Sequence, residues 1–226
     1  HLLRYSLINL LHLRVESKSA KIIDMRGKVL RKTTLPGETI FEVVFGDLLE
    51  EQSEAIVNAA NRFLQHGGGV AGMIAAKGGS QIQKESDEWL RDHGPVQHAV
   101  PAVTSAGSLP FRYILHAVGP EWGEGDEDEK LKQAIQGCLV TANSLCLRSI
   151  SMPPIATGIF GFPKQRAAEI FYKTIQDFCT NRKGNTLESI RIVIIDREGA
   201  DIFASHFDRW FKDENYTTPD STSLTR

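Results

Sequence analysis

The sequence is poor in cysteine. Its 226 residues include three, Cys138, Cys146 and Cys179, and no two of them have the CxxC spacing. Their number and spacing indicate neither a disulfide framework nor a zinc site, and we expect no metal. Cys138 and Cys146 fall in an apolar helical pattern, which predicts buried thiols in a reducing compartment.

The sequence also lacks a long apolar run and an excess of charge. No run approaches the roughly 20 residues of a membrane-spanning helix, and the apolar residues 2–13 have neither a basic leader nor a small-residue cleavage site. A net charge of −2 gives no electrostatic footprint for broad nucleic-acid binding. We therefore expect no signal peptide, no membrane partner and no direct nucleic-acid partner, in a cytoplasmic or nuclear protein.

The length of the chain predicts one domain with tails. Residues 1–38 are mixed in character and are interpreted as an N-terminal extension with one strand near residues 21–24. Residues 39–212 carry the clear pattern of a folded domain, and the polar residues 213–226 are predicted to be disordered. The chain opens on His1 rather than Met, which indicates a fragment of a longer polypeptide.

Within residues 39–212, short apolar runs alternate with longer amphipathic stretches. The apolar runs predict strands at residues 41–45, 55–58, 99–105, 113–118, 149–155 and 190–195. Helical periodicity predicts helices at residues 70–77, 80–93 and 127–147, one opened by Pro163 and a last one carrying Phe203 and Phe207. This alternation predicts a three-layer α/β fold with a mixed, mostly parallel central sheet.

Asparagine and glycine are concentrated after one predicted strand. The stretch VNAAN occupies residues 57–61, and HGGGVAG follows at residues 66–72. A glycine-rich turn that leads into a helix presents unpaired N–H groups to an anion, usually a phosphate. Asparagine amides are suited to sugar hydroxyls. Two further loops, at residues 46–48 and 156–162, also follow strands, so all three should converge on one cleft for a phosphorylated, ribose-containing ligand.

These motifs, in this order, resemble those of the macrodomain family. The series is Gly46-Asp47-Leu48, VNAAN, GGGVAG, His116-Ala117-Val118-Gly119-Pro120 and TGIFGFP at residues 157–163, and it covers roughly residues 40–212. The resemblance is closest to macrodomains of macro-containing poly(ADP-ribose) polymerase-like proteins and of coronaviruses. Residues 162–164 are more similar to the cellular form.

The resemblance implies an ADP-ribose cleft. By position, Asp47 would accept a hydrogen bond from the adenine amino group and the Leu48 N–H would contact the ring. Asn61 would hold the distal ribose, with Asn58 bracing its loop. The glycine loop, with Gly68, Gly69, Val70 and Ala71, would wrap the distal ribose and diphosphate. The facing loop would close from the other side, with Phe160 against the distal ribose; its residues are Thr157, Gly158, Ile159, Phe160 and Gly161.

Two functional classes fit such a cleft. One is a hydrolase that removes mono-ADP-ribose from acidic side chains of modified proteins, with Asn61, Gly69 and Phe160 at the reacting end and no cofactor. The other is a reader that holds ADP-ribose within a larger multidomain protein. Some family hydrolases carry an aspartate where this chain has Ala71, so the loop has no obvious general base. In either class the expected partners are ADP-ribose and mono-ADP-ribosylated proteins, and the isolated domain is expected to be a monomer.

The chain also has two histidines near these motifs. His116 lies inside an apolar strand and is interpreted as a core histidine with its hydrogen bonds satisfied. His66 adjoins the glycines and is expected at a solvated loop position.

Overall fold

The computed structural model describes residues 27–211. Within this range the chain forms seven strands, five α-helices and one 3₁₀ turn, η1 (Leu48–Glu50). The strands are β1 (Lys28–Leu35), β2 (Thr39–Phe45), β3 (Ala55–Ala59), β4 (Ala102–Thr104), β5 (Tyr113–Ala117), β6 (Ser149–Met152) and β7 (Ser189–Ile194). The helices are α1 (Gly69–Gly78), α2 (Ser80–His93), α3 (Glu127–Ser144), α4 (Lys164–Asn181) and α5 (Arg197–Trp210).

The strands form one mixed sheet in the order β1-β2-β7-β6-β3-β5-β4. The pairs from β2 through β7, β6 and β3 to β5 are parallel, whereas the edge strands β1 and β4 pair antiparallel to their neighbours. Because parallel strands are joined by crossovers, helices cover both faces of the sheet. The prediction of a mixed, mostly parallel α/β fold is confirmed.

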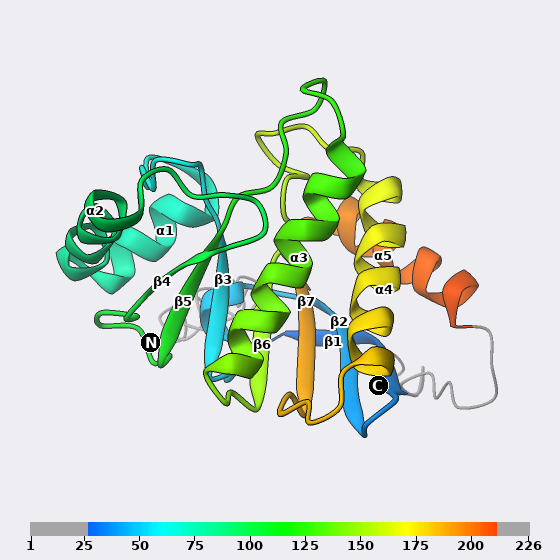
Figure 1. Ribbon diagram of the computed structural model, residues 1–226. Coiled ribbons are helices and arrows are strands. Elements are labelled where there is room, and N and C mark those ends of the chain that lie inside the picture. The colour runs from blue at the N-terminus through cyan, green and yellow to red at the C-terminus, as the bar shows by residue number, and fades with distance from the viewer. Residues whose placement is uncertain (1–26, 212–226) are drawn as a thin grey trace, which may run out of the picture.

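The two faces of the sheet bury separate groups of side chains. The larger core lies between the sheet and α3, α4 and α5, where Phe41 contacts Tyr172 and Phe207 at ring-centroid distances of 5.8 Å. On the other face, Ile74 of α1 and Ile82 of α2 pack with apolar residues of β2, β3, β5 and β7. In Figure 1, α3 and α4 cross in front of the sheet, and α1 and α2 lie beside β3, β4 and β5. The described helices include none that is long and apolar enough to cross a membrane.

The prediction that residues 1–38 form an extension outside the folded domain differs from the structure at β1. Residues 28–35 pair with β2 along its length, so the folded domain reaches back at least to residue 28. Basic residues interrupt the alternation of apolar and polar side chains in this strand. Arg31 donates a hydrogen bond to Asp208 on α5, and Nζ of Lys32 lies 3.4 Å from Oε1 of Glu42. Charged residues are frequent on edge strands because they discourage further pairing. The expected strand near residues 21–24 and the tail at residues 213–226 lie outside the described residues.

The prediction that the thiol is buried is confirmed for Cys138 but wrong for Cys146. Cys138 and Cys179 are buried free thiols, whereas Cys146 is exposed. The helical pattern that included Cys146 ends earlier, since α3 stops at Ser144. Cys146 then has a φ of 54°, which turns the chain away from the helix axis. Burial holds the pKa of the Cys138 thiol far above its ordinary value.

Candidate functional site

A cavity of about 610 Å³ lies at the carboxyl ends of β2, β7, β6 and β3. Neighbouring strands lie roughly 4.8 Å apart, so four strand ends span about 14 Å. The loops that follow these strands form the walls, together with the first turns of α1. The cavity is therefore elongated across the sheet, with a β2–β7 end and a β3 end.

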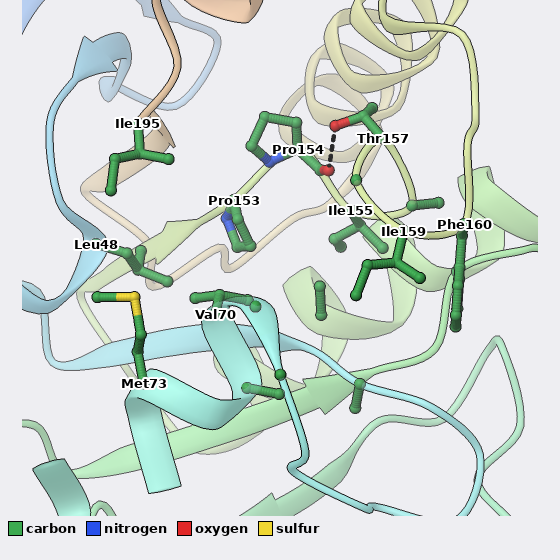
Figure 2. A pocket seen from close by; sticks show the side chains of 18 of the residues that line it. Leu48, Val70, Met73, Pro153, Pro154, Ile155, Thr157, Ile159, Phe160 and Ile195 are labelled. Carbon is green, nitrogen blue, oxygen red and sulfur yellow. Dashed lines mark hydrogen bonds between the residues drawn. The ribbon is translucent and has the colours of Figure 1, made fainter. Parts of the chain in front are cut away.

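At the β2–β7 end, the Asp47 carboxylate lies beside an apolar slot. Asp47 follows β2, and its Oδ1 accepts from the Leu49 N–H at 2.9 Å and so caps η1. Its Oδ2 lies 4.0 Å from Nζ of Lys77. Figure 2 shows Leu48, Met73 and Ile195 gathered around this end of the cavity. Such a slot suits a flat apolar ring with a polar edge.

A second carboxylate, Asp196, follows β7 at the same end. Its Oδ1 accepts from the Gly199 N–H at 2.8 Å and caps α5, and Nζ of Lys164 donates to it at 2.8 Å. Burial alone would raise the pKa of Asp196, but these hydrogen bonds outweigh burial and lower that pKa. Asp196 is thus held ionised by structural partners.

The glycine loop forms the wall on the α1 side. A Cβ added to Gly67 or Gly68 would meet no protein atom within 4 Å, so packing does not require glycine there. Gly69 has a φ of 56°, a conformation that favours glycine, and it starts α1. Its N-cap residue, Gly68, supplies no side-chain hydrogen bond to the helix. The first N–H groups of α1 therefore remain available to an anion in the cavity.

The loop after β6 forms the opposite wall. Pro153, Pro154, Thr157, Ile159 and Phe160 all line the cavity, and Figure 2 shows Ile159 and Phe160 at the end away from Ile195. Hydrogen bonds within the loop fix its shape. The Thr157 hydroxyl and N–H both donate to the Pro154 carbonyl, at 2.8 and 3.2 Å, and the amide at 162 donates to the carbonyl at 156.

Asn61 lies at the β3 end, where it closes its own loop. Its Oδ1 accepts from the N–H groups of Phe63 and Gln65 at 3.0 and 3.3 Å, and its Nδ2 donates to the Gln65 carbonyl at 2.8 Å. An amide has two N–H hydrogens, so one donor of Asn61 is still available to a ligand. Asn61 is therefore a loop-bracing residue as well as a cavity residue.

Asn58 lies in the core and does not line the cavity. Its side chain is fully buried, and its Nδ2 lies 3.0 Å from Nδ1 of His116 and 3.4 Å from Nδ1 of His66. His116 is a core histidine as expected, with no exposed surface. The expectation of a solvated His66 is wrong, since the ring is half-buried and hydrogen-bonded on both nitrogens.

The cavity contains most of the ligand residues that the motifs predict. They are Asp47, Leu48, Asn61, Gly68, Gly69, Val70, Ala71, Thr157, Gly158, Ile159 and Phe160. Asn58 and Gly161 lie outside its lining. Sequence reasoning missed Met73, Ile195 and Asp196, although Ile195 ends a predicted strand and Asp196 follows it, as the other three loops follow theirs.

Comparison with known proteins identifies the fold family. Residues 57–171 match the Macro domain family. A relative from Sulfurisphaera tokodaii, described as an uncharacterized protein, is 47% identical over 180 residues, which are 79% of this chain and 97% of that protein. The chain belongs to the macrodomain family.

Other macrodomain relatives and structures agree with this assignment. A protein of Pantoea vagans named O-acetyl-ADP-ribose deacetylase 1 is 40% identical over 71% of this chain and 94% of its own length. An uncharacterized protein of Thermotoga maritima is 48% identical over 83% of this chain, which spans 30% of that relative. These relatives are prokaryotic, and a particular closeness to polymerase-like or coronavirus macrodomains stays a prediction.

Solved macrodomains share the architecture. The Oceanobacillus iheyensis macrodomain with ADP has a TM-score of 0.76 at 28% identity and is matched over 82% of this chain and 98% of that chain. The Trypanosoma brucei macrodomain in complex with ADP-ribose has a TM-score of 0.67 at 27% identity, over 74% of this chain and 68% of that chain.

Proposed function

We propose that this macrodomain binds ADP-ribose in the elongated cavity and hydrolyses mono-ADP-ribose from acidic side chains of modified proteins. The observation that carries the proposal is the order of chemical groups along the cavity. An apolar slot with the Asp47 carboxylate lies at one end, backbone N–H groups of α1 lie along the wall, and Asn61 and Phe160 lie toward the other end. Adenine, diphosphate and distal ribose occur in the same order in ADP-ribose.

The named relatives support an ester as the scissile bond. Two Pantoea vagans proteins, 40% and 37% identical to this chain, are named O-acetyl-ADP-ribose deacetylases. O-acetyl-ADP-ribose and ADP-ribosylated glutamate share a carboxylic ester on the distal ribose. In either case water adds and the ester is cleaved to a carboxylic acid and free ADP-ribose. One cavity can therefore serve both substrates if the acyl side opens to solvent.

Asn61, Gly69 and Phe160 are the residues that would surround the reacting ester. Asn61 would hold the distal ribose through its remaining N–H, and the N–H groups near Gly69 would bind the diphosphate beside it. Phe160 would support the sugar from the facing loop. Positioning of this kind lowers the entropic part of the barrier without a dedicated base. The ligand's own diphosphate would assist the attacking water.

A reader that does not cleave is the second candidate, and Ala71 favours it. Ala71 lines the cavity in the first turns of α1, where a carboxylate would lie close to the distal sugar. Among the described lining residues the carboxylates are Asp47 and Asp196, and both follow strands at the other end. Slow or absent turnover would follow from this lack of a base.

Two assays together test the proposal. Calorimetry with ADP-ribose measures binding, and a protein mono-ADP-ribosylated on glutamate measures release of ADP-ribose, with O-acetyl-ADP-ribose as a second ester. Binding with release supports the hydrolase. Binding without release from either ester supports the reader. A failure to bind millimolar ADP-ribose contradicts both.

A further inference from the structure

A chain of polar side chains runs from the glycine loop into the core. His66 directly precedes Gly67, and its Nε2 lies 3.0 Å from the hydroxyl of Ser86 on α2. Its Nδ1 lies 3.4 Å from Nδ2 of Asn58 on β3, and its ring lies 5.1 Å from the ring of His116 on β5. His66 thus ties the start of the glycine loop to three separate elements.

The hydrogen bonds at both ends of the chain fix its donors and acceptors. The Ser86 hydroxyl donates to the Ile82 carbonyl at 2.8 Å, so it must accept from Nε2–H of His66. The Thr104 hydroxyl donates to the carbonyl at 105 at 2.9 Å, so it must accept from Nε2–H of His116, 2.8 Å away. Both rings therefore carry a proton on Nε2.

Asn58 completes the chain because its two N–H hydrogens meet two acceptors. With the protons on Nε2, Nδ1 of each histidine accepts one of them. The Oδ1 of Asn58 is buried and has no hydrogen-bond partner among residues 27–211. With Nδ2 of Asn58 toward both rings, both histidines are neutral, and a proton added to Nδ1 of His66 would face the Asn58 NH₂.

Burial and a nearby charge shift the pKa of His66 in opposite directions. Burial lowers the pKa of His66 below its ordinary value of 6.5, and the carboxylate of Asp87 on α2 raises it in part. His116 faces it from β5, and burial lowers the pKa of His116 to about 3. Asn58 from β3 and Ser86 from α2 are uncharged. At neutral pH the effect of burial exceeds that of Asp87, so the neutral ring is favoured.

We propose that His66 is a positioning residue whose neutral ring holds the glycine loop in the shape that receives the diphosphate of ADP-ribose. The inference rests on the proposed function for the identity of the ligand. Protonation of His66 would force Asn58 to turn its Oδ1 toward the ring, which would break the bond from Asn58 to His116. The loop would then lose its fixed start, and ligand affinity would fall.

Three variants test the positioning role. His66→Phe keeps a ring of similar size but loses both hydrogen bonds, His66→Gln can still donate to Ser86, and His93→Gln is a matched control at the exposed end of α2. We expect ADP-ribose affinity to fall about tenfold in the Phe variant and about threefold in the Gln variant, with no change in the control. Equal affinity in all variants would overturn the inference.

The loop itself provides a readout that needs no ligand. Amide hydrogen exchange at Gly67, Gly68 and Gly69 in the free protein should speed up in the Phe variant and not in the control. Unchanged exchange in a folded Phe variant would overturn the positioning role. Faster exchange in a protein that binds no ADP-ribose would instead refute only the proposed function.

Acidification is the second test. Because the network needs the neutral ring, ADP-ribose should bind with full affinity above the pKa of His66. The affinity should fall as the pH drops through that pKa. Calorimetry from about pH 7.5 to 5, with an NMR titration of His66 under the same conditions, compares affinity with protonation. In the wild-type protein, affinity should follow the fraction of neutral His66. In the His66→Gln variant, affinity should not fall over this pH range. Protonation of His66 without loss of affinity would overturn the inference.

Discussion

Gly119 and Ala156 pack so closely that a Cβ on Gly119 would lie 2.8 Å from the Cβ of Ala156. Gly119 follows β5, and Ala156 lies in the loop after β6 with a φ of 69°. A non-glycine residue in this conformation costs about 1–3 kcal/mol, so surrounding contacts must hold it. The contact with Gly119 is one of them, and it fixes the wall of the cavity that carries Thr157 and Phe160.

Gly119→Ala should therefore damage both stability and binding. The added methyl group also meets the side chain of Ile155 at 2.8 Å, and overpacking of this kind costs about 1–3 kcal/mol. Thermal unfolding should show a lower melting temperature, and calorimetry a weaker ADP-ribose complex. Gly158→Ala is the control, because a Cβ there meets no protein atom within 4 Å. It should leave the melting temperature unchanged, and an equal drop in both variants would contradict this account.

Asp47→Asn should weaken binding by removing a charged acceptor for the adenine amino group. A hydrogen bond to a charged group is worth about 1.5–3 kcal/mol, or roughly tenfold to hundredfold in affinity. Asparagine is also a good N-cap, so η1 should keep the cap that Asp47 provides to Leu49. The decisive measurement compares ADP-ribose with its hypoxanthine analogue, which has a carbonyl in place of the amino group. Wild type should prefer adenine, and the variant should lose that preference; a preserved preference would exclude Asp47 from base recognition.

The residues that the sequence singled out by their local chemistry lie along one cavity. Glycines and asparagines that follow apolar strands mark turns and helix starts, and Asp47, Asn61, Gly69 and Phe160 all line the cavity. The fold followed from the alternation of strands and helices. Apolar strands covered on both faces are recognisable without knowledge of their neighbours.

The sequence did not predict what depends on distant neighbours. The role of His66 arises from contacts with Asn58 and Ser86, which are 8 and 20 positions away in the sequence. No local sequence pattern predicts that these residues meet. β1 was missed because an edge strand rich in Lys and Arg has no apolar alternation, and its identity depends on pairing with β2. Ile195 was missed because it lines the cavity only when β7 lies between β2 and β6.

Stability should fall as the pH drops below about 6.5, because the folded protein keeps His116 neutral. The pKa of His116 is about 3 in the folded protein, and the ordinary value is 6.5. Between these values the unfolded chain binds a proton at His116 that the folded protein does not bind. From about pH 7.5 to 5.5 this residue alone should remove about 1.4 kcal/mol from the free energy of unfolding. Urea unfolding at the two pH values measures the loss. An NMR titration should show a neutral His116 throughout, and its protonation in the folded protein above pH 5 would refute the argument.

Asn61→Ala should slow ester cleavage and also disorder the 61–65 loop. The substitution removes three hydrogen bonds within that loop as well as the second N–H of an amide that lines the cavity. Misplacement of a substrate by about 1 Å can cost ~100-fold in rate, so turnover should fall at least tenfold. Affinity should fall less, because adenine and diphosphate contacts lie elsewhere in the cavity. Single-turnover rates and calorimetry separate the two effects, and a variant that cleaves at the wild-type rate would remove Asn61 from the reacting end.

Ala71→Asp should increase the cleavage rate if the missing base limits turnover. Residue 71 is the third residue of α1 and lines the cavity, so an aspartate there would lie near the helix N-terminus, where the dipole favours a negative charge. A general base contributes typically 10²–10⁴-fold, and even a poorly placed carboxylate should raise release of ADP-ribose about tenfold. Ala71→Asn is the matched control, since it has the same shape without the base and should not accelerate the reaction. Equal acceleration by both variants would attribute the gain to a change in loop shape. No acceleration in an Asp variant that still binds ADP-ribose would show that something other than the absent base at residue 71 limits the rate.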